Sequence, residues 1–131
     1  AYAYRDLNCR DMWCGRYDDC ALTVLTTVIS APQPYRVIVD AGSKALSSDR
    51  AVRTAGYGVL REAPDAFLDK LNEEHGFLSL TQAGLRLRVG DKVRIIPNHC
   101  CAVSNLFDEV HIVQGSDVLD SYPVAARGKS R

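Results

Sequence analysis

A histidine followed by two cysteines stands at the end of an apolar, strand-like segment in the second half of the chain. The segment reads Ile95-Ile96-Pro97-Asn98-His99-Cys100-Cys101. Side chains two residues apart share a face of extended backbone, so His99 and Cys101 are expected to point one way and Cys100 the other. An imidazole nitrogen and a thiolate sulfur are both zinc ligands, at about 2.0–2.1 Å and about 2.3 Å respectively. Two protein ligands leave positions open for water or substrate, which is typical of a catalytic metal site.

The same three residues also have a plainer interpretation. A histidine and two cysteines at a strand end are often ordinary packing residues, and the H-x-C spacing alone does not distinguish packing from a metal site. Both interpretations stay open at this point.

The other titratable residues are weaker candidates for chemistry. Lys44 lies in a loop without a phosphate-binding frame, so we expect a salt-bridge role rather than Schiff-base chemistry. His75 follows Glu73 and Glu74 and is expected in a hydrogen-bonded pair at a strand end. His111 lies in an alternating segment and is expected to be a surface histidine or one with a hydrogen-bond partner.

The cysteines are expected to be free thiols. The five cysteines are an odd number, and the adjacent Cys100 and Cys101 rarely bridge each other, so a disulfide framework is disfavoured. Cys9, Cys14 and Cys20 lack the C-x2-C spacing of a structural zinc site. The pattern favours a reducing, cytoplasmic setting.

Length and charge limit the class of protein. The chain has 131 residues, which fits one domain but only about half of a (β/α)8 barrel of ~250 residues. Sixteen basic residues balance sixteen acidic residues without a long run of either sign, so neither nucleic acid nor an anionic membrane is an expected partner. The longest apolar stretch, residues 21–29, is too short to span a bilayer. The chain starts with Ala1 and without a leader pattern, and it is expected to be an excised piece.

The elements that position these residues are predicted to be short strands. The stretch 41–58 contains three glycines and three serines and is expected to be a long functional or packing loop that ends in a Gly56-Tyr57-Gly58 turn. A short helix after Cys101 is a weaker expectation. Apolar alternation and turn residues otherwise predict an all-β, Greek-key-like barrel of about seven or eight strands, with segments at 22–30, 35–40, 67–71, 77–80, 85–89, 93–97, 109–114 and 118–122. The last two flank Gly115-Ser116-Asp117, the clearest hairpin turn in the sequence.

Six motifs occur in a recognisable order over nearly the whole chain. They begin at Asp19, Val39, Gly56, Glu73, Pro97 and Ala126, and they read DCALTV, VDAGSKALSSD, GYG, EEHG, PNHCC and ARG. In this order they resemble the carboxy-terminal domain of the D-serine dehydratase and D-threonine aldolase family. The segment Met12–Tyr17 matches no motif of that family.

This resemblance implies a fold and a reaction. Members of the family belong to the alanine-racemase-like fold and join an amino-terminal (β/α)8 barrel, which holds pyridoxal phosphate on a lysine, to this β-domain. Residues 1–131 would be the metal-binding domain alone, without that barrel. The family's H-x-C or H-x-D metal pair falls on His99 and Cys101, with Zn²⁺, or Mn²⁺ or Mg²⁺, as the ion. The substrate would be a small β-hydroxy D-amino acid, and the full-length protein would be a homodimer.

Two reactions remain open under this resemblance. In a dehydratase the metal helps the β-hydroxyl to leave, giving a keto acid and ammonia, whereas in an aldolase it favours carbon–carbon cleavage to glycine and an aldehyde. A soft thiolate at position 101 suits zinc, whereas a carboxylate suits manganese, which favours the dehydratase. Without the barrel the chain is not expected to be active alone. The competing interpretations are a stand-alone, non-catalytic β-domain that binds a metal or a protein, and a β-domain that binds no metal.

Overall fold

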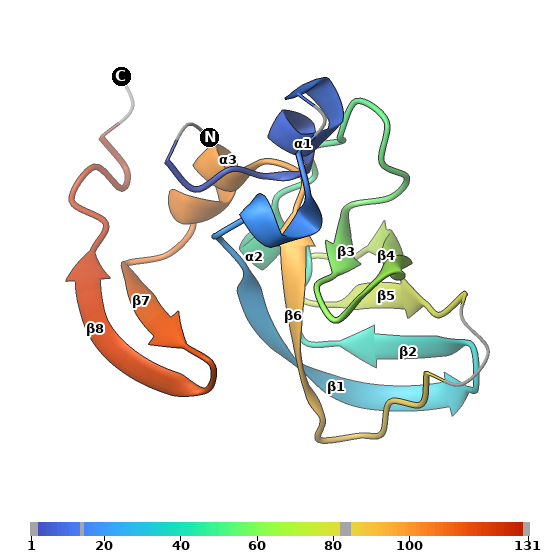
Figure 1. The fold of residues 1–131 in the computed structure, drawn as a ribbon. Coiled ribbons are helices and arrows are strands. Elements are labelled where there is room, and N and C mark those ends of the chain that lie inside the picture. The colour runs from blue at the N-terminus through green and yellow to red at the C-terminus, as the bar shows by residue number, and fades with distance from the viewer. Residues whose placement is uncertain (1–2, 14, 82–84, 130–131) are drawn as a thin grey trace.

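Six strands of the chain close into an antiparallel barrel. The computed structural model describes residues 3–13, 15–81 and 85–129. The barrel consists of β1 Val24–Gln33, β2 Arg36–Val39, β3 Gly58–Leu60, β4 Ala63–Leu71, β5 Gly76–Ser79 and β6 Lys92–Pro97 (Figure 1). Its strand order is β1-β2-β5-β4-β3-β6, and β6 returns to pair with β1. The predicted all-β barrel is confirmed.

Two further strands form a separate hairpin. They are β7, Glu109–Gln114, and β8, Asp117–Pro123, which pair around the predicted turn. Figure 1 shows this hairpin standing to one side of the barrel, apart from its strands. In the described residues the barrel therefore has six strands, fewer than the seven or eight predicted for it, and β7 and β8 lie outside it.

Alternating side chains explain how the barrel buries its core. In β1, Val24, Thr26 and Val28 point inward and are buried, whereas Leu25 and Ile29 point outward and are exposed. This period of two leaves one face of each strand for the core. Register shifts interrupt the β1–β2, β3–β4 and β4–β5 ladders. Such irregularities bend strands, as a barrel of only six strands requires.

Short helices cover the end of the barrel where β6 finishes. They are α1 Leu7–Trp13, the 3-10 helix η1 Tyr17–Asp19, α2 Ser43–Leu46 and α3 Cys100–Ser104. Helix α1 places Leu7 in a second apolar cluster with Cys20, Val59 and Ile96. Within the described ranges of the chain, no helix has the length and apolar character needed to cross a membrane.

Two expectations from the sequence need correction. The stretch 41–58 is not entirely loop, because it includes α2 and the first residue of β3. The predicted strand at 85–89 is absent, since residues 85–88 belong to no strand. Both edges of β6 are already paired, one with β1 and the other with β3, so no edge remains for residues 85–89.

Candidate functional site

His99 and Cys101 lie at the junction between β6 and α3. Strand β6 ends at Pro97, His99 is the N-cap of α3, and the helix starts at Cys100. The expectation that all three motif residues continue a strand is therefore wrong, whereas the expected short helix is present. Cys100 is fully buried and Cys101 is exposed, so the two thiols do face different environments.

A buried carboxylate fixes the start of α3. One oxygen of Asp6 accepts a hydrogen bond from the backbone N–H of Cys9 in α1, and the other accepts from the N–H of Cys100, both at 2.9 Å. Burial alone raises the pKa of Asp6, but these hydrogen bonds outweigh burial and hold the pKa below its ordinary value. Asp6 therefore caps two helices at once and couples α1 to the segment that contains Cys101.

A second carboxylate orients the imidazole of His99. The Nδ1 atom of His99 lies 2.6 Å from Oδ2 of Asp49, and both side chains are partly exposed. This contact raises the pKa of His99, burial opposes the rise, and the Cys101 side chain within hydrogen-bonding reach adds to it. Since Asp49 occupies Nδ1, the other ring nitrogen, Nε2, is the one left for a ligand.

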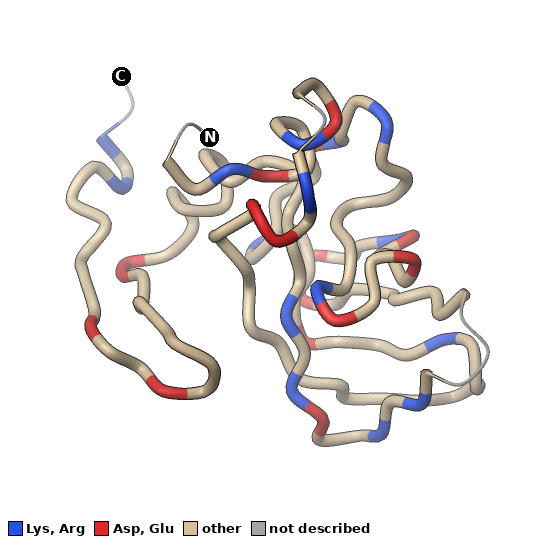
Figure 2. The backbone as a smooth tube through the Cα atoms, in the orientation of Figure 1, with Lys and Arg blue, Asp and Glu red and all other residues tan. Residues whose placement is uncertain are grey.

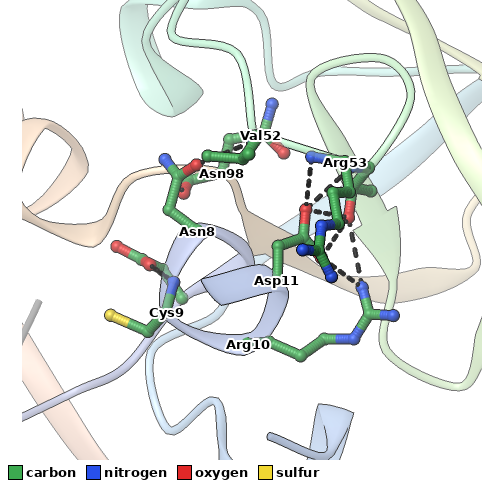
Figure 3. A network of polar contacts seen from close by, with 9 residues as sticks. Asn8, Cys9, Arg10, Asp11, Val52, Arg53 and Asn98 are labelled. Atoms are coloured by element: carbon green, nitrogen blue, oxygen red, sulfur yellow. Dashed lines mark hydrogen bonds and ion pairs between the residues drawn. The ribbon is translucent and has the colours of Figure 1, made fainter. Parts of the chain in front are cut away.

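Helix α1 holds the loop that presents Asp49. Both oxygens of the Asp11 carboxylate bond to this loop, accepting from the N–H groups of Arg53 and Thr54 at 2.8 Å and from the Thr54 hydroxyl (Figure 3). Asn8 accepts from the N–H of Val52 and donates to the carbonyl of Asn98.

Asn98, the residue after barrel strand β6, completes this hydrogen-bond network. Its side-chain amide donates to the backbone carbonyls of Asp49 and Gly56. Asn98 also directly precedes His99 in the chain. The two residues of the His99–Asp49 pair are thus fixed by hydrogen bonds to one common framework.

Three other cysteines are buried and protonated at neutral pH. Burial raises the pKa of the Cys9 thiol, raises that of Cys20 to about 11 and raises that of Cys100 to about 12. Their thiols are therefore poor ligands and nucleophiles, because both roles need the thiolate. Among the described residues, Cys9, Cys20, Cys100 and Cys101 form no disulfide, and Cys14 lies outside the described residues.

The donor set around His99 fits a metal with open coordination positions. An imidazole and a thiol are adjacent and partly exposed, and zinc accepts both. Across residues 3–13, 15–81 and 85–129, no group of three or more His, Cys, Asp or Glu side chains is arranged to hold a metal ion. The remaining ligands would therefore have to come from water, substrate or another protein segment.

The structure separates the other candidates from this site. Lys44 pairs with Glu73 at 3.1 Å and Glu74 at 2.7 Å, which confirms the predicted salt-bridge role. The two glutamates thus bond to Lys44 rather than forming the expected pair with His75, which is exposed. His111 is exposed and bonds to the hydroxyl of Ser121, as predicted. Gly56 and Tyr57 form the expected turn.

A cavity of about 430 Å³ lies beside α1, away from the H-x-C pair. Its lining includes Arg10, Asp11, Tyr17, Arg53 and Phe67, but neither His99 nor Cys101. The Arg10 guanidinium is already engaged by Asp11 at 2.8 Å and stacks over the Tyr17 ring. Two charged groups of this cavity, Arg10 and Asp11, are therefore already paired with each other.

Sequence reasoning missed Asp6 and Asp49. Asp49 lies 50 residues before His99 in the chain, and Asp6 lies 94 residues before Cys100, so no local spacing relates them. The only available signal for Asp49 was its place at the end of the motif Val39–Asp49.

Comparison with known proteins places the chain in a family. The sequence model of the family described as "Putative serine dehydratase domain" matches residues 21–113. An uncharacterised protein of Mycobacterium tuberculosis is 39% identical over 116 residues, which cover 86% of this chain and 87% of that protein. A 3-hydroxy-D-aspartate aldolase of Paracoccus denitrificans is 37% identical over 109 residues, covering 83% of this chain but 26% of that enzyme. The chain thus spans most of the short relative and about a quarter of the enzyme.

Solved structures agree with this placement. A D-threo-3-hydroxyaspartate dehydratase, solved as a cysteine-to-alanine mutant in the metal-free form, superposes with a TM-score of 0.82 at 30% identity. The match covers 93% of this chain and 36% of that one. A structure of the same name is a histidine-to-alanine mutant, and its altered position lies two residues before the altered cysteine. His99 and Cys101 have the same spacing here.

Proposed function

Because this chain belongs to the serine dehydratase domain family, we propose that it is the metal-binding half of a lyase active site. The substrate class is a small β-hydroxy D-amino acid, and the reaction is of the D-serine dehydratase type, giving a keto acid and ammonia. One observation supports the proposal above the others: an exposed cysteine and an imidazole held by a carboxylate meet at the end of β6.

His99 and Cys101 would be the protein ligands of a divalent ion. The Nε2 atom of His99 and the sulfur of Cys101 are the two donors, and Asp49 would keep the imidazole in the tautomer with a free Nε2. When bound, such an ion supplies Lewis acidity towards the β-hydroxyl oxygen of a substrate. Thiolate ligation suits zinc better than manganese or magnesium, and this preference supports a dehydratase over an aldolase.

The second half of the site would come from a pyridoxal phosphate barrel outside residues 1–131. The family resemblance implies such a barrel, and the aldolase of Paracoccus denitrificans is about four times as long as the segment it shares with this chain. The chain's own contribution would be to hold the metal and to orient it through His99 and Cys101.

A second candidate is a stand-alone domain that binds a metal without catalysis. The match to a short mycobacterial protein over 87% of its length supports this alternative, because that relative has little room for a barrel in its own chain. The two candidates share the metal site and differ in whether a barrel partner completes it.

Asp49 gives a prediction within the proposed site. Asp49→Ala should weaken zinc binding by roughly 10–100-fold, which is the typical effect of losing a group that hydrogen-bonds a ligating histidine. Asp49→Asn should fall between Asp49→Ala and wild type, since it keeps an acceptor and loses the charge. Competition with a coloured zinc chelator measures the affinity. Asp18→Ala removes an exposed carboxylate elsewhere and should bind zinc like wild type; unchanged affinity in Asp49→Ala would contradict this role.

Zinc titration of the chain tests the proposal as a whole. We expect one zinc ion per chain in elemental analysis, with binding lost in His99→Ala and in Cys101→Ala. His111→Ala, which removes an exposed histidine on β7, is the matched control and should retain the metal. Binding that survives both site substitutions, or no binding in wild type, would contradict the proposal.

A further inference from the structure

The cavity beside α1 has apolar and partly aromatic walls. Val59 and Phe67 are cross-strand partners in the β3–β4 ladder, and Tyr17 packs with them in the second apolar cluster. Val59 is buried, whereas Phe67 and Tyr17 are half-buried and keep part of their surface open. The volume of about 430 Å³ lies within the roughly 300–1,000 Å³ of small-molecule sites. The cavity can therefore receive the flat apolar body of a small ligand.

One cation of this cavity has no partner of opposite charge. Arg10 and Asp11 neutralise each other across 2.8 Å. Arg53 is exposed, and its guanidinium pairs with no acidic side chain in the described ranges of the chain. The other described residues that line the cavity carry no charge. The lining therefore has one net positive charge, and Arg53 supplies it.

Helix α1 fixes the backbone that carries Arg53. Asp11 accepts the N–H groups of Arg53 and Thr54, and Nη1 of Arg10 donates to the Thr54 hydroxyl at 3.1 Å (Figure 3). Stacking over Tyr17, at 4.1 Å from the ring centroid, orients the Arg10 guanidinium as well. Figure 2 shows basic positions both on α1 and on the loop between α2 and β3, at the same end of the molecule. The charged lining is thus held in place before any ligand arrives.

Part of the cavity comes from a segment outside the region that the family model matches. Gly15 and Tyr17 belong to the segment Met12–Tyr17, which carries none of the family's motifs, and Arg10 precedes it. All three lie before residue 21, where the match to the family's sequence model begins. Neither residue of the proposed metal pair lines the cavity. The cavity is therefore separate from the metal site, and the proposed reaction does not account for it.

We propose that this cavity binds a small aromatic monocarboxylate, with its ring against the apolar walls and its carboxylate on Arg53. A guanidinium is a planar fork that matches the two oxygens of a carboxylate and binds them with paired hydrogen bonds. One net positive charge balances one carboxylate. A dianion such as a phosphate monoester would place its second charge near the Asp11 carboxylate, and such a contact between like charges is unfavourable. The inference does not depend on the metal site.

Titration with indole-3-acetate, followed by amide NMR of the full chain, tests this site. A metal chelator in the buffer prevents the carboxylate from binding to a metal ion instead. We expect saturable shifts of the amide signals of Arg53, Thr54 and Val59, with a dissociation constant in the millimolar range or tighter. Tryptamine has the same ring system but an ammonium group in place of the carboxylate. It should bind at least about tenfold more weakly, because its charge has the same sign as that of Arg53.

Substitutions separate the role of the guanidinium from that of the walls. Arg53→Ala should weaken binding of indole-3-acetate by at least about tenfold, and Arg53→Lys, which keeps the charge but not the fork, should fall between Arg53→Ala and wild type. Phe67→Leu should weaken binding by about threefold, because it removes an aromatic contact and keeps an apolar one. Arg86→Ala removes an exposed arginine that does not line the cavity and should bind like wild type. The dispersion of the amide signals shows that each variant is folded.

Three results would overturn the proposal. They are a wild-type chain without saturable shifts, shifts centred on residues away from this cavity, and an affinity that Arg53→Ala leaves unchanged.

Discussion

Asp6→Ala should destabilise the fold by about 3–5 kcal/mol. The substitution leaves two buried backbone N–H groups, those of Cys9 and Cys100, without their acceptor. Each buried donor left unsatisfied costs about 1–3 kcal/mol, and the bond to the Cys9 N–H is itself the N-cap bond of α1. This loss is a large part of the 5–15 kcal/mol typical of a domain. Urea denaturation followed by circular dichroism measures it, with the exposed Asp18→Ala expected within about 0.5 kcal/mol of wild type.

The pH dependence of stability provides an independent check on Asp6. Its pKa is lower in the folded chain than the ordinary value of 3.8. The charged carboxylate therefore contributes stability above about pH 4, and that contribution is lost as the pH falls towards the folded-state pKa. Asp6→Asn cannot ionise, so the difference in unfolding free energy between wild type and Asp6→Asn should shrink on acidification below pH 4. A difference that stays constant down to pH 2 would contradict the role of the charge.

Gly56→Ala should be the second strongly destabilising change, at about 2–5 kcal/mol. Gly56 has a φ of +76°, and a Cβ placed there would lie 2.1 Å from the carbonyl oxygen of Leu68. An alanine with positive φ costs about 1–2 kcal/mol, and forcing an extra carbon into a packed site costs a further 1–3 kcal/mol or so. The carbonyl of Gly56 also accepts from Asn98, so the shift should reach the residue before His99.

Gly90→Ala is the matched control for the steric clash of the added Cβ. Gly90 also has a positive φ, +97°, but a Cβ there meets no atom within 4 Å. Only the backbone strain should remain, so we expect a loss of about 1–2 kcal/mol in the same denaturation experiment. Equal losses in the two variants would show that the close approach of Gly56 to Leu68 is not what excludes a side chain.

The repetitive parts of this fold were predictable from the sequence. Alternation of apolar and polar residues identified β1, β2, β5 and β6, and the Gly115-Ser116 turn identified the β7–β8 hairpin within one residue at each end. These signals are local, because a strand with one buried face repeats every two residues. The H-x-C spacing of His99 and Cys101 is likewise a local signal that the sequence shows directly.

The elements that position the site were not predictable in this way. Helix α1 is only seven residues long, and its place depends on the capping carboxylate of Asp6 and on Asn8 and Asp11, which bond to residues more than 40 positions away. Strand β3 has three residues, too few for a period of two to appear. The predicted strand at 85–89 failed for the opposite reason: its alternation is present, but β6 offers it no free edge.

The central claim is that His99 and Cys101 bind one metal ion together, and cobalt(II) substitution tests it most directly. A thiolate bound to cobalt(II) gives an intense sulfur-to-metal charge-transfer absorption, whereas a histidine-only site gives none. We expect this absorption in the wild-type chain and in His111→Ala, its loss in Cys101→Ala, and a weakened affinity for cobalt in Asp49→Ala. A spectrum without the charge-transfer absorption, or one that Cys101→Ala leaves unchanged, would contradict the account.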